Sequence, residues 1–182
     1  MKINIISGSP RANSITKRAA LYLQNLLSKN HEIAFIDLHQ IDLPPMQTVY
    51  TNDENTPAEF QELRNKMFAA DAFILVTPEY NGGYSPSMKN LLDHFTKTTY
   101  TKKAIGIVTA SDGMFGGIRA SQQMQLLICA LFGIPCPQML IIPQVDKKFD
   151  VEGNLLDETF TRNVDNFLKE YLWLAEALHK SK

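Results

Sequence analysis

The sequence has little cysteine, no excess of either charge and no long uninterrupted apolar run. It holds 182 residues with two cysteines, Cys129 and Cys136. Their spacing matches neither a CxxC redox pair nor a metal site, so we interpret both as buried, reduced core residues. Eighteen basic residues against nineteen acidic ones leave a net charge of −1, which gives no electrostatic basis for binding nucleic acid or an anionic membrane. We therefore expect a small-molecule partner.

Metal sites and membrane segments are not indicated either. The four histidines are scattered without the spacing of metal ligands, so no metal is predicted. Residues 126–142 form the one stretch apolar enough to suggest a membrane span, but Gly133, Pro135 and Pro137 interrupt it. The apolar residues after Met1 are too few for a signal peptide. These features predict a cytoplasmic protein.

Apolar runs bounded by turn signals predict five strands, with helical periods between them. The strands are expected at residues 3–7, 32–37, 72–77, 104–110 and 139–142. Their continuous hydrophobicity is typical of parallel strands covered on both faces. Helices are expected at residues 15–27, 57–67, 88–95, 118–132 and 160–178. The alternation predicts one α/β domain over residues 1–182, a doubly wound five-stranded parallel sheet with helices on both faces.

Two of the helix ends carry local signals. Thr56 is expected to cap the second helix, with Pro57 in its first position and Glu59 reaching back in a capping box. Gly133, with Pro135 just beyond it, is expected to end the fourth helix.

The loop after the first strand leads into a helix and carries Ser9, Arg11, Ser14 and Thr16. Doubly wound sheets bind ligands beyond the carboxyl ends of their strands, where the strand order reverses. Hydroxyls, a guanidinium and a helix N-terminus suit a phosphate group. The alternative is a Ser-capped helix after a Gly-Ser-Pro turn. GxGxxG, GxxxxGK[ST] and cysteine are absent from the loop, so a phosphate that is bound and left intact fits best.

The loop after the third strand reads PEYNGGYSPSMKN over residues 78–90. Its paired glycines permit close approach of a ligand, and Tyr80 and Tyr84 offer flat apolar faces, so a planar ring fits against it. The alternative is that Asn81-Gly82 is a hairpin turn, which the helical period that follows disfavours.

The loop after the fourth strand, residues 110–117, is rich in glycine. Its backbone amides suit the polar edge of a ring system, although such a connection taken alone is more often only a loop. Its placement beside the other two loops favours a shared site.

Several motifs together resemble those of NADPH-dependent FMN reductases, a family that includes quinone, azo-dye and chromate reductases. The resemblance covers nearly the whole chain and rests on Gly8-Ser9-Pro10-Arg11 with Ser14, Asp37-Leu38, Leu43-Pro44-Pro45, Pro78-Glu79-Tyr80-Asn81-Gly82 with Lys89-Asn90 and Asp93, and Gly116-Gly117-Ile118-Arg119-Ala120. It implies a flavodoxin-like sheet with strand order 2-1-3-4-5, FMN as cofactor, and NADPH or NADH as electron donor. It also implies a homodimer or homotetramer in which a neighbouring subunit helps to close the flavin site.

The resemblance implies roles for individual positions. Ser9, Arg11, Ser14 and Thr16 would hold the FMN phosphate, Pro78, Glu79, Tyr80, Asn81 and Gly82 would wrap the isoalloxazine, and Ser111, Gly113 and Gly116 would border the ring or ribityl chain from the other side. The Glu79 side chain is expected to meet a cation of a partner subunit or to stay solvated. Thr16 stands where asparagine is frequent in the family. Gly83-Tyr84-Ser85-Pro86-Ser87 replaces the commoner Ser-x-Pro-Gly-x, so the lip over the ring is expected to differ in shape.

The implied activity is that of an NAD(P)H-dependent flavin oxidoreductase. Hydride would pass from NADPH to N5 of FMN, and the electrons then to free FMN, a quinone, an azo compound or a similar small acceptor. The flavin carries this chemistry, so no catalytic residue is predicted. The alternatives are a flavodoxin-type electron carrier, disfavoured by the near-neutral charge and by Arg11, and a non-enzymatic flavin-binding redox sensor. Residues 38–56 exceed ordinary loop lengths and are expected to form a lid, a subunit contact or a mobile flap.

Overall fold

The predicted parallel sheet is present in the computed structural model, which describes residues 1–181. Its longer strands are β1 (Lys2–Ser7), β2 (Glu32–Asp37), β3 (Ala72–Tyr80) and β5 (Ala104–Ala110). β1 pairs in parallel with β2 and β3, and β3 pairs in parallel with β5. The resulting strand order is β2-β1-β3-β5, with short strands beyond β5 at the edge of the sheet. This is the order of a flavodoxin-like doubly wound sheet, which confirms the predicted fold class.

The edge beyond β5 differs in detail because the predicted fifth strand is divided. β6 (Ile134–Pro135) pairs with the beginning of β5, and β7 (Leu140–Ile142) pairs with its end. Pro135 and Pro137 have no amide hydrogen to donate, so the ladder cannot continue between the two pieces. A further short strand, β4 (Gly83–Tyr84), pairs antiparallel with the end of β3, which makes a sheet of seven strands.

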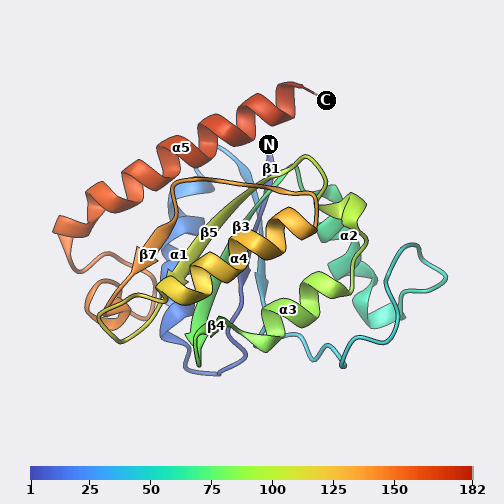
Figure 1. Cartoon of the computed structure of the whole chain (residues 1–182), viewed down its shortest axis with the longest axis horizontal. Coiled ribbons are helices and arrows are strands. Elements are labelled where there is room, and N and C mark those ends of the chain that lie inside the picture. The colour runs from blue at the N-terminus through green and yellow to red at the C-terminus, as the bar shows by residue number, and fades with distance from the viewer. Residues whose placement is uncertain (182) are drawn as a thin grey trace.

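Helices cover both faces of the sheet, as predicted. They are α1 (Ile15–Leu27), α2 (Gln61–Ala69), α3 (Pro86–Asp93), α4 (Ile118–Ala130) and α5 (Thr161–Lys180), with short 3-10 helices η1 (Ala58–Phe60), η2 (Lys97–Thr99), η3 (Val145–Lys147) and η4 (Glu158–Phe160). α1 and α5 share one buried core with the sheet, which includes Leu23 and Phe167. The other core, with Leu91 and Met124, lies under α2, α3 and α4. In Figure 1 the yellow helix α4 crosses in front of β3 and β5.

The predicted capping box at the second helix is wrong. Thr56 is buried and donates its hydroxyl to the Asn52 carbonyl at 2.6 Å. Pro57 precedes η1, and α2 itself begins at Gln61 without a side-chain cap. The preceding turn therefore uses the Thr56 hydroxyl that the sequence pattern assigned to the helix.

The fourth helix ends close to the predicted glycine, but for a different reason. The residue in the left-handed region is Phe132, with φ of 59°, and not Gly133. A Cβ at Gly133 would lie 2.6 Å from Ile105 Cδ1 and 3.1 Å from Ile128 Cγ2. Glycine at position 133 thus leaves room for the close packing of Ile105 and Ile128 between β5 and α4.

The two cysteines differ in exposure, which corrects the prediction that both are buried. Cys136 is buried, whereas Cys129 is exposed at the end of α4, and both thiols are free. Within residues 1–181, no helix has the length and apolar character needed to cross a membrane. The same residues contain no cluster of three or more His, Cys, Asp or Glu side chains placed to hold a metal ion.

Candidate functional site

The three predicted loops meet in one cleft of about 650 Å³ at the carboxyl ends of β1, β3 and β5. Most of the predicted residues line it, namely Ser9, Arg11, Ser14, Thr16, Pro78, Glu79, Tyr80, Asn81 and Ser111. Gly82, Gly113 and Gly116 do not line it. The volume is typical of a small-molecule site.

A larger hollow, of about 900 Å³, lies along the free edge of β2 between α1 and α2. Its lysines are paired with carboxylates of the same hollow: Lys17 Nζ lies 2.7 Å from Asp37 Oδ2, and Lys66 Nζ lies 2.6 Å from Glu62 Oε1. We assign the ligand to the smaller cleft, because the three loops meet there at the carboxyl ends of the strands, where doubly wound sheets bind ligands.

The N-terminus of α1 opens into the cleft. Ser14 is the N-cap residue, and its Oγ accepts a hydrogen bond from the Lys17 amide at 3.4 Å. Thr16 also lines the cleft and is only 2% exposed, yet its hydroxyl has no hydrogen-bond partner within residues 1–181. A hydroxyl without a partner in the chain is free to donate to a ligand, and a helix N-terminus favours an anion. This end of the cleft therefore fits a phosphate group, while Ser14 caps the helix as the alternative interpretation held.

Arg11, Tyr80 and Ser9 form a cluster across the floor of the cleft. The Arg11 guanidinium lies over the Tyr80 ring, 4.6 Å from its centroid, which is a cation–π distance. The Tyr80 hydroxyl lies 3.3 Å from Ser9 Oγ, which also accepts from the Arg11 amide at 3.4 Å. The cluster joins the loop after β1 to the loop after β3.

Residues 79–84 form a tight hairpin, which the sequence analysis disfavoured. Asn81 and Gly82 have φ of 51° and 86°, the left-handed values that a type I′ turn needs at both central positions. β4 returns antiparallel to the end of β3, and α3 then begins at Pro86. The hairpin and the helical period are both present, because the returning strand is so short. Asn81 at its tip still lines the cleft.

Ser85 fixes the two walls of the cleft relative to one another. It is fully buried, and its Oγ donates to the Gly8 carbonyl and accepts from the Met88 amide at 3.1 Å. Its own amide donates to Thr77 Oγ1 at 3.1 Å. Pro86 follows in the first position of α3, where its missing amide hydrogen is not needed. One serine thus links the loop after β1, strand β3 and helix α3.

The Glu79 carboxylate occupies the N-terminus of α4, which corrects the expectation that it faces solvent or a partner's cation. Its Oε2 accepts from the amides of Arg119 and Ala120 at 3.0 and 3.2 Å. Its Oε1 lies 3.3 Å from Arg119 Nη1. The N-cap residue of α4 is Gly117, which has no side chain to do this. Glu79 therefore caps a helix that begins 39 residues further along the chain, counted from position 79 to position 118.

The loop between β5 and α4 is held by backbone hydrogen bonds. The Ser111 amide donates to the Ile142 carbonyl at 3.1 Å, and the Val145 amide donates to the Ser111 carbonyl at 3.0 Å. Gly116 has φ of 59°, and a Cβ there would lie 2.7 Å from Ile141 Cγ2. Gly116 is therefore required for packing against β7, and its predicted place at the flavin is not supported by the lining of the cleft.

Residues 38–56 are tied to α3 by hydrogen bonds. Asn90 Oδ1 accepts from the Met46 amide at 2.9 Å, and its amide group donates to carbonyls of the same segment. The Tyr50 amide donates to the His94 carbonyl at 2.7 Å. The asparagine of the Lys89-Asn90 motif thus holds this segment.

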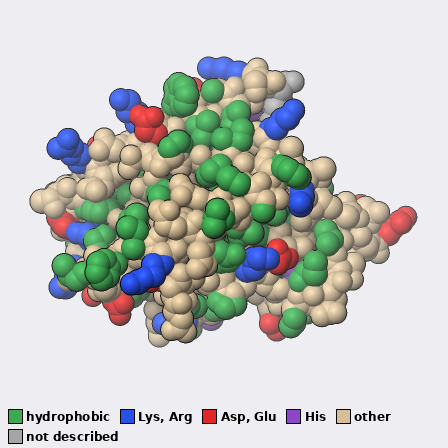
Figure 2. All heavy atoms as spheres, viewed as in Figure 1, with side chains coloured by type: hydrophobic (Ala, Val, Ile, Leu, Met, Phe, Trp, Pro, Cys, Tyr) green, Lys and Arg blue, Asp and Glu red, His purple; other side chains and the backbone are tan. Residues whose placement is uncertain are grey.

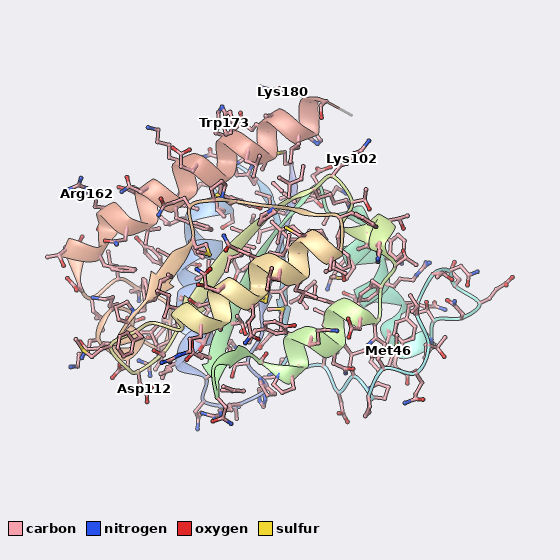
Figure 3. The ribbon with its side chains drawn as sticks, in the orientation of Figure 1. Met46, Lys102, Asp112, Arg162, Trp173 and Lys180 are labelled. Atoms are coloured by element: carbon pink, nitrogen blue, oxygen red, sulfur yellow. The ribbon has the colours of Figure 1, made fainter. Side chains whose placement is uncertain are left out.

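The cleft also contains residues that the sequence analysis did not single out. These are Asn13, Ile15, Pro86, Ala110 and Asp112. Asp112, labelled in Figure 3, lies on the loop between β5 and α4. Apart from Pro86, each is a chain neighbour of a predicted residue, so widening the motifs by one position finds them. Pro86 carried its own signal, because a serine followed by proline is a common helix start.

Comparisons with known proteins identify relatives of this chain. The model of the NADPH-dependent FMN reductase family matches residues 1–147. An FMN-dependent NADPH-azoreductase of Staphylococcus saprophyticus is 31% identical over 160 residues, which cover 82% of this chain and 81% of the relative. An enzyme of the same description from Staphylococcus aureus is 30% identical, with 85% and 83% covered.

Solved structures share the fold at lower identity. FerB, a flavoenzyme NAD(P)H:(acceptor) oxidoreductase from Paracoccus denitrificans, has a TM-score of 0.77 at 22% identity and covers 97% of both chains. An apo NADH:FMN oxidoreductase has a TM-score of 0.69 at 19% identity, covering 97% of this chain and 89% of that one. The family match and the relatives confirm the resemblance read from the motifs: the chain belongs to the family of NADPH-dependent FMN reductases.

Proposed function

We propose that the cleft between the three loops binds FMN with its phosphate at the N-terminus of α1. Thr16 carries this proposal, because its hydroxyl has no hydrogen-bond partner among residues 1–181 and the residue lines the cleft at a helix end that favours anions. Ser9, Arg11 and Ser14 would complete the phosphate site, with Arg11 leaving the Tyr80 ring to pair with the phosphate.

The ring of the flavin would lie between the hairpin and the loop after β5. Pro78, Glu79, Tyr80 and Asn81 form one wall of the cleft, and Ser111 lies on the other. Bound FMN supplies hydride chemistry, taking two electrons from NADPH and passing them to a small acceptor. The chain's own residues bind the cofactor, orient it and shape the acceptor's access. An azo compound is the acceptor that the relatives' names favour.

The outer face of α4 is the expected contact between subunits. Ile118 and Leu126 are 43% and 75% exposed, and Arg119 is the one charged residue of this helix. Figure 2 shows hydrophobic side chains spread over the front of the molecule, where α4 lies, with most charged side chains toward its margin. Uncharged exposed helix faces are typical of interfaces. This supports a homodimer or homotetramer. We further propose a cytoplasmic protein with one FMN-binding domain over residues 1–182.

The phosphate assignment is tested by measuring FMN affinity, through quenching of flavin fluorescence, in Arg11→Ala and Thr16→Val. Each variant should weaken FMN binding about 10- to 100-fold, because a hydrogen bond to a charged group contributes about 1.5–3 kcal/mol. Arg162→Ala, on the exposed surface of α5, is the control for lost positive charge and should leave affinity unchanged. Wild-type affinity in both Arg11→Ala and Thr16→Val would refute the assignment.

A further inference from the structure

The ion pair between Glu79 and Arg119 sits asymmetrically at the cleft. The Glu79 side chain is 15% exposed and lines the cleft, whereas the Arg119 side chain is 66% exposed. Water screens an exposed charge more strongly than a partly buried one. The carboxylate therefore acts on the cleft more strongly than the guanidinium that accompanies it.

The helix end behind this carboxylate carries the opposite partial charge. The first amides of a helix amount to about half a positive charge, which stabilises an anion placed nearby. Here the amides of Arg119 and Ala120 are already directed at Glu79 Oε2. The positive end of α4 is thus neutralised within the chain and is not offered to a ligand in the cleft.

Close packing at the start of α4 limits which residue can cap this helix. Gly117 has φ of 85°, and a Cβ there would lie 2.9 Å from Thr109 Cβ and 3.5 Å from Glu79 Cβ. The start of α4 is therefore packed directly against β5 and the hairpin, and a side chain at the N-cap position has no room. Only a residue on another element reaches the amides, and Glu79 is that residue.

We propose that Glu79 is a positioning residue that also lowers the reduction potential of the bound flavin. Its carboxylate holds α4 against the hairpin and places negative charge beside a ring that itself gains negative charge near N1 and O2 on reduction. A low potential favours passing electrons onward to a weak oxidant. This inference rests on the proposed placement of FMN in the cleft.

The test compares charge removal at Glu79 with charge removal at Arg119. In Glu79→Gln one amide oxygen still accepts from both backbone amides, but the negative charge is gone. Arg119→Met removes the positive charge and keeps the backbone amide that Glu79 caps. The midpoint potential of bound FMN should rise in Glu79→Gln and fall in Arg119→Met. A tenfold change in the relative affinity for reduced and oxidised FMN corresponds to about 30 mV for this two-electron couple, and Glu79→Gln should reach about that size.

A matched control pair lies at the other end of the molecule. Lys180 Nζ and Glu176 Oε2 are 3.8 Å apart on exposed α5, and Figure 3 shows Lys180 at the opposite end from Asp112. Glu176→Gln and Lys180→Met change the net charge equally and should leave the potential unchanged.

The positioning role has a readout without flavin. In the apoprotein, hydrogen exchange at the Arg119 and Ala120 amides should stay slow in Glu79→Gln and become at least about tenfold faster in Glu79→Ala, which removes the acceptor. Equal exchange rates in Glu79→Ala and the wild type would overturn the positioning role.

The outcomes separate this inference from the proposed function. Unchanged potentials in all variants, with FMN affinity still sensitive to Arg11→Ala, would overturn the role of Glu79 and leave the flavin site standing. Shifts of the same sign in Glu79→Gln and Arg119→Met would also overturn it, because opposite charges must act in opposite directions. FMN affinity insensitive to both Arg11→Ala and Thr16→Val would overturn the placement and the inference together.

Discussion

The N-terminus of α1 lines the cleft, whereas that of α4 is capped by the carboxylate of Glu79, a residue that lines the same cleft. At α1, Ser14 accepts a hydrogen bond from one amide, and the Thr16 hydroxyl has no partner among the described residues. At α4, the Glu79 carboxylate accepts hydrogen bonds from two backbone amides and from the guanidinium of Arg119. The helix N-terminus at α1 is therefore left available to a ligand, whereas the one at α4 is occupied by Glu79.

This difference assigns a direction to the ligand. An anionic group is favoured at the open end, where the partial positive charge is unopposed, and disfavoured beside Glu79. A cofactor with a phosphate at one end and a ring at the other therefore fits in one orientation. The following substitutions test the difference between the two helix N-termini, from the largest expected effect to the smallest.

Gly117→Ala should disrupt the packing at the N-terminus of α4. The new Cβ would require a left-handed backbone at φ of 85° and would lie 2.9 Å from Thr109 Cβ. Left-handed backbone costs about 1–2 kcal/mol and overpacking about 1–3 kcal/mol, so we expect about 2–4 kcal/mol lower free energy of unfolding in urea. Gly113→Ala is the control in the same loop, because its nearest neighbour would be Ser111 Oγ at 3.7 Å. A Gly117→Ala protein as stable as Gly113→Ala would contradict the close packing.

Ser14→Asp should place a carboxylate at the N-terminus of α1, as Glu79 does at the N-terminus of α4. Aspartate caps a helix about as well as serine, so the thermal midpoint should stay close to wild type. FMN affinity should fall about tenfold or more, because the carboxylate repels the phosphate. Ser14→Ala should instead lose about 1 kcal/mol of stability from the missing cap. Undiminished FMN affinity in Ser14→Asp would show that the phosphate does not bind there.

The smallest effect concerns a third helix start, where the partly exposed Asp157 caps η4 by accepting from the Thr159 amide. Its hydrogen bond to Lys148 Nζ, followed by that from the Thr159 hydroxyl, lowers the pKa of Asp157 to about 2. A carboxyl whose folded pKa is depressed stabilises the fold above its unfolded pKa of about 3.9, and this stabilisation is lost as pH falls through about 2. Asp157→Asn should therefore flatten the acid unfolding curve between about pH 4 and 2. Identical curves for Asp157→Asn and the wild type would contradict the assignment.

The sequence predicted the cleft well because its residues cluster in short motifs at strand ends. Ser9, Thr16 and Tyr80 sit where the alternation of strands and helices places loops on one edge of the sheet. The doubly wound parallel sheet followed from the same alternation, whereas the strand order was implied by the resemblance to the FMN reductases. Periodicity and local motifs carry this information without any knowledge of distant contacts.

The partners of individual side chains were not predictable, because they lie far away along the chain. Ser85 and Gly8 are 77 residues apart, and Glu79 and Arg119 are 40 apart. Local patterns also misled where a nearer partner was available, as when Thr56 bonded the preceding turn at Asn52. Helix capping competes with turn formation for the same hydroxyl, and the amino-acid sequence alone does not show which of the two hydrogen bonds forms.

The Ser85 link and the backbone bonds of Ser111 also have a consequence for synthesis. The cleft needs Gly8 joined to Ser85, and the loop after β5 joined to Val145. A chain that ends before Val145 already carries every predicted flavin residue but lacks the hydrogen bond from the Val145 amide to the Ser111 carbonyl. The residues predicted to contact FMN are therefore synthesised before one of the contacts that hold the loop after β5.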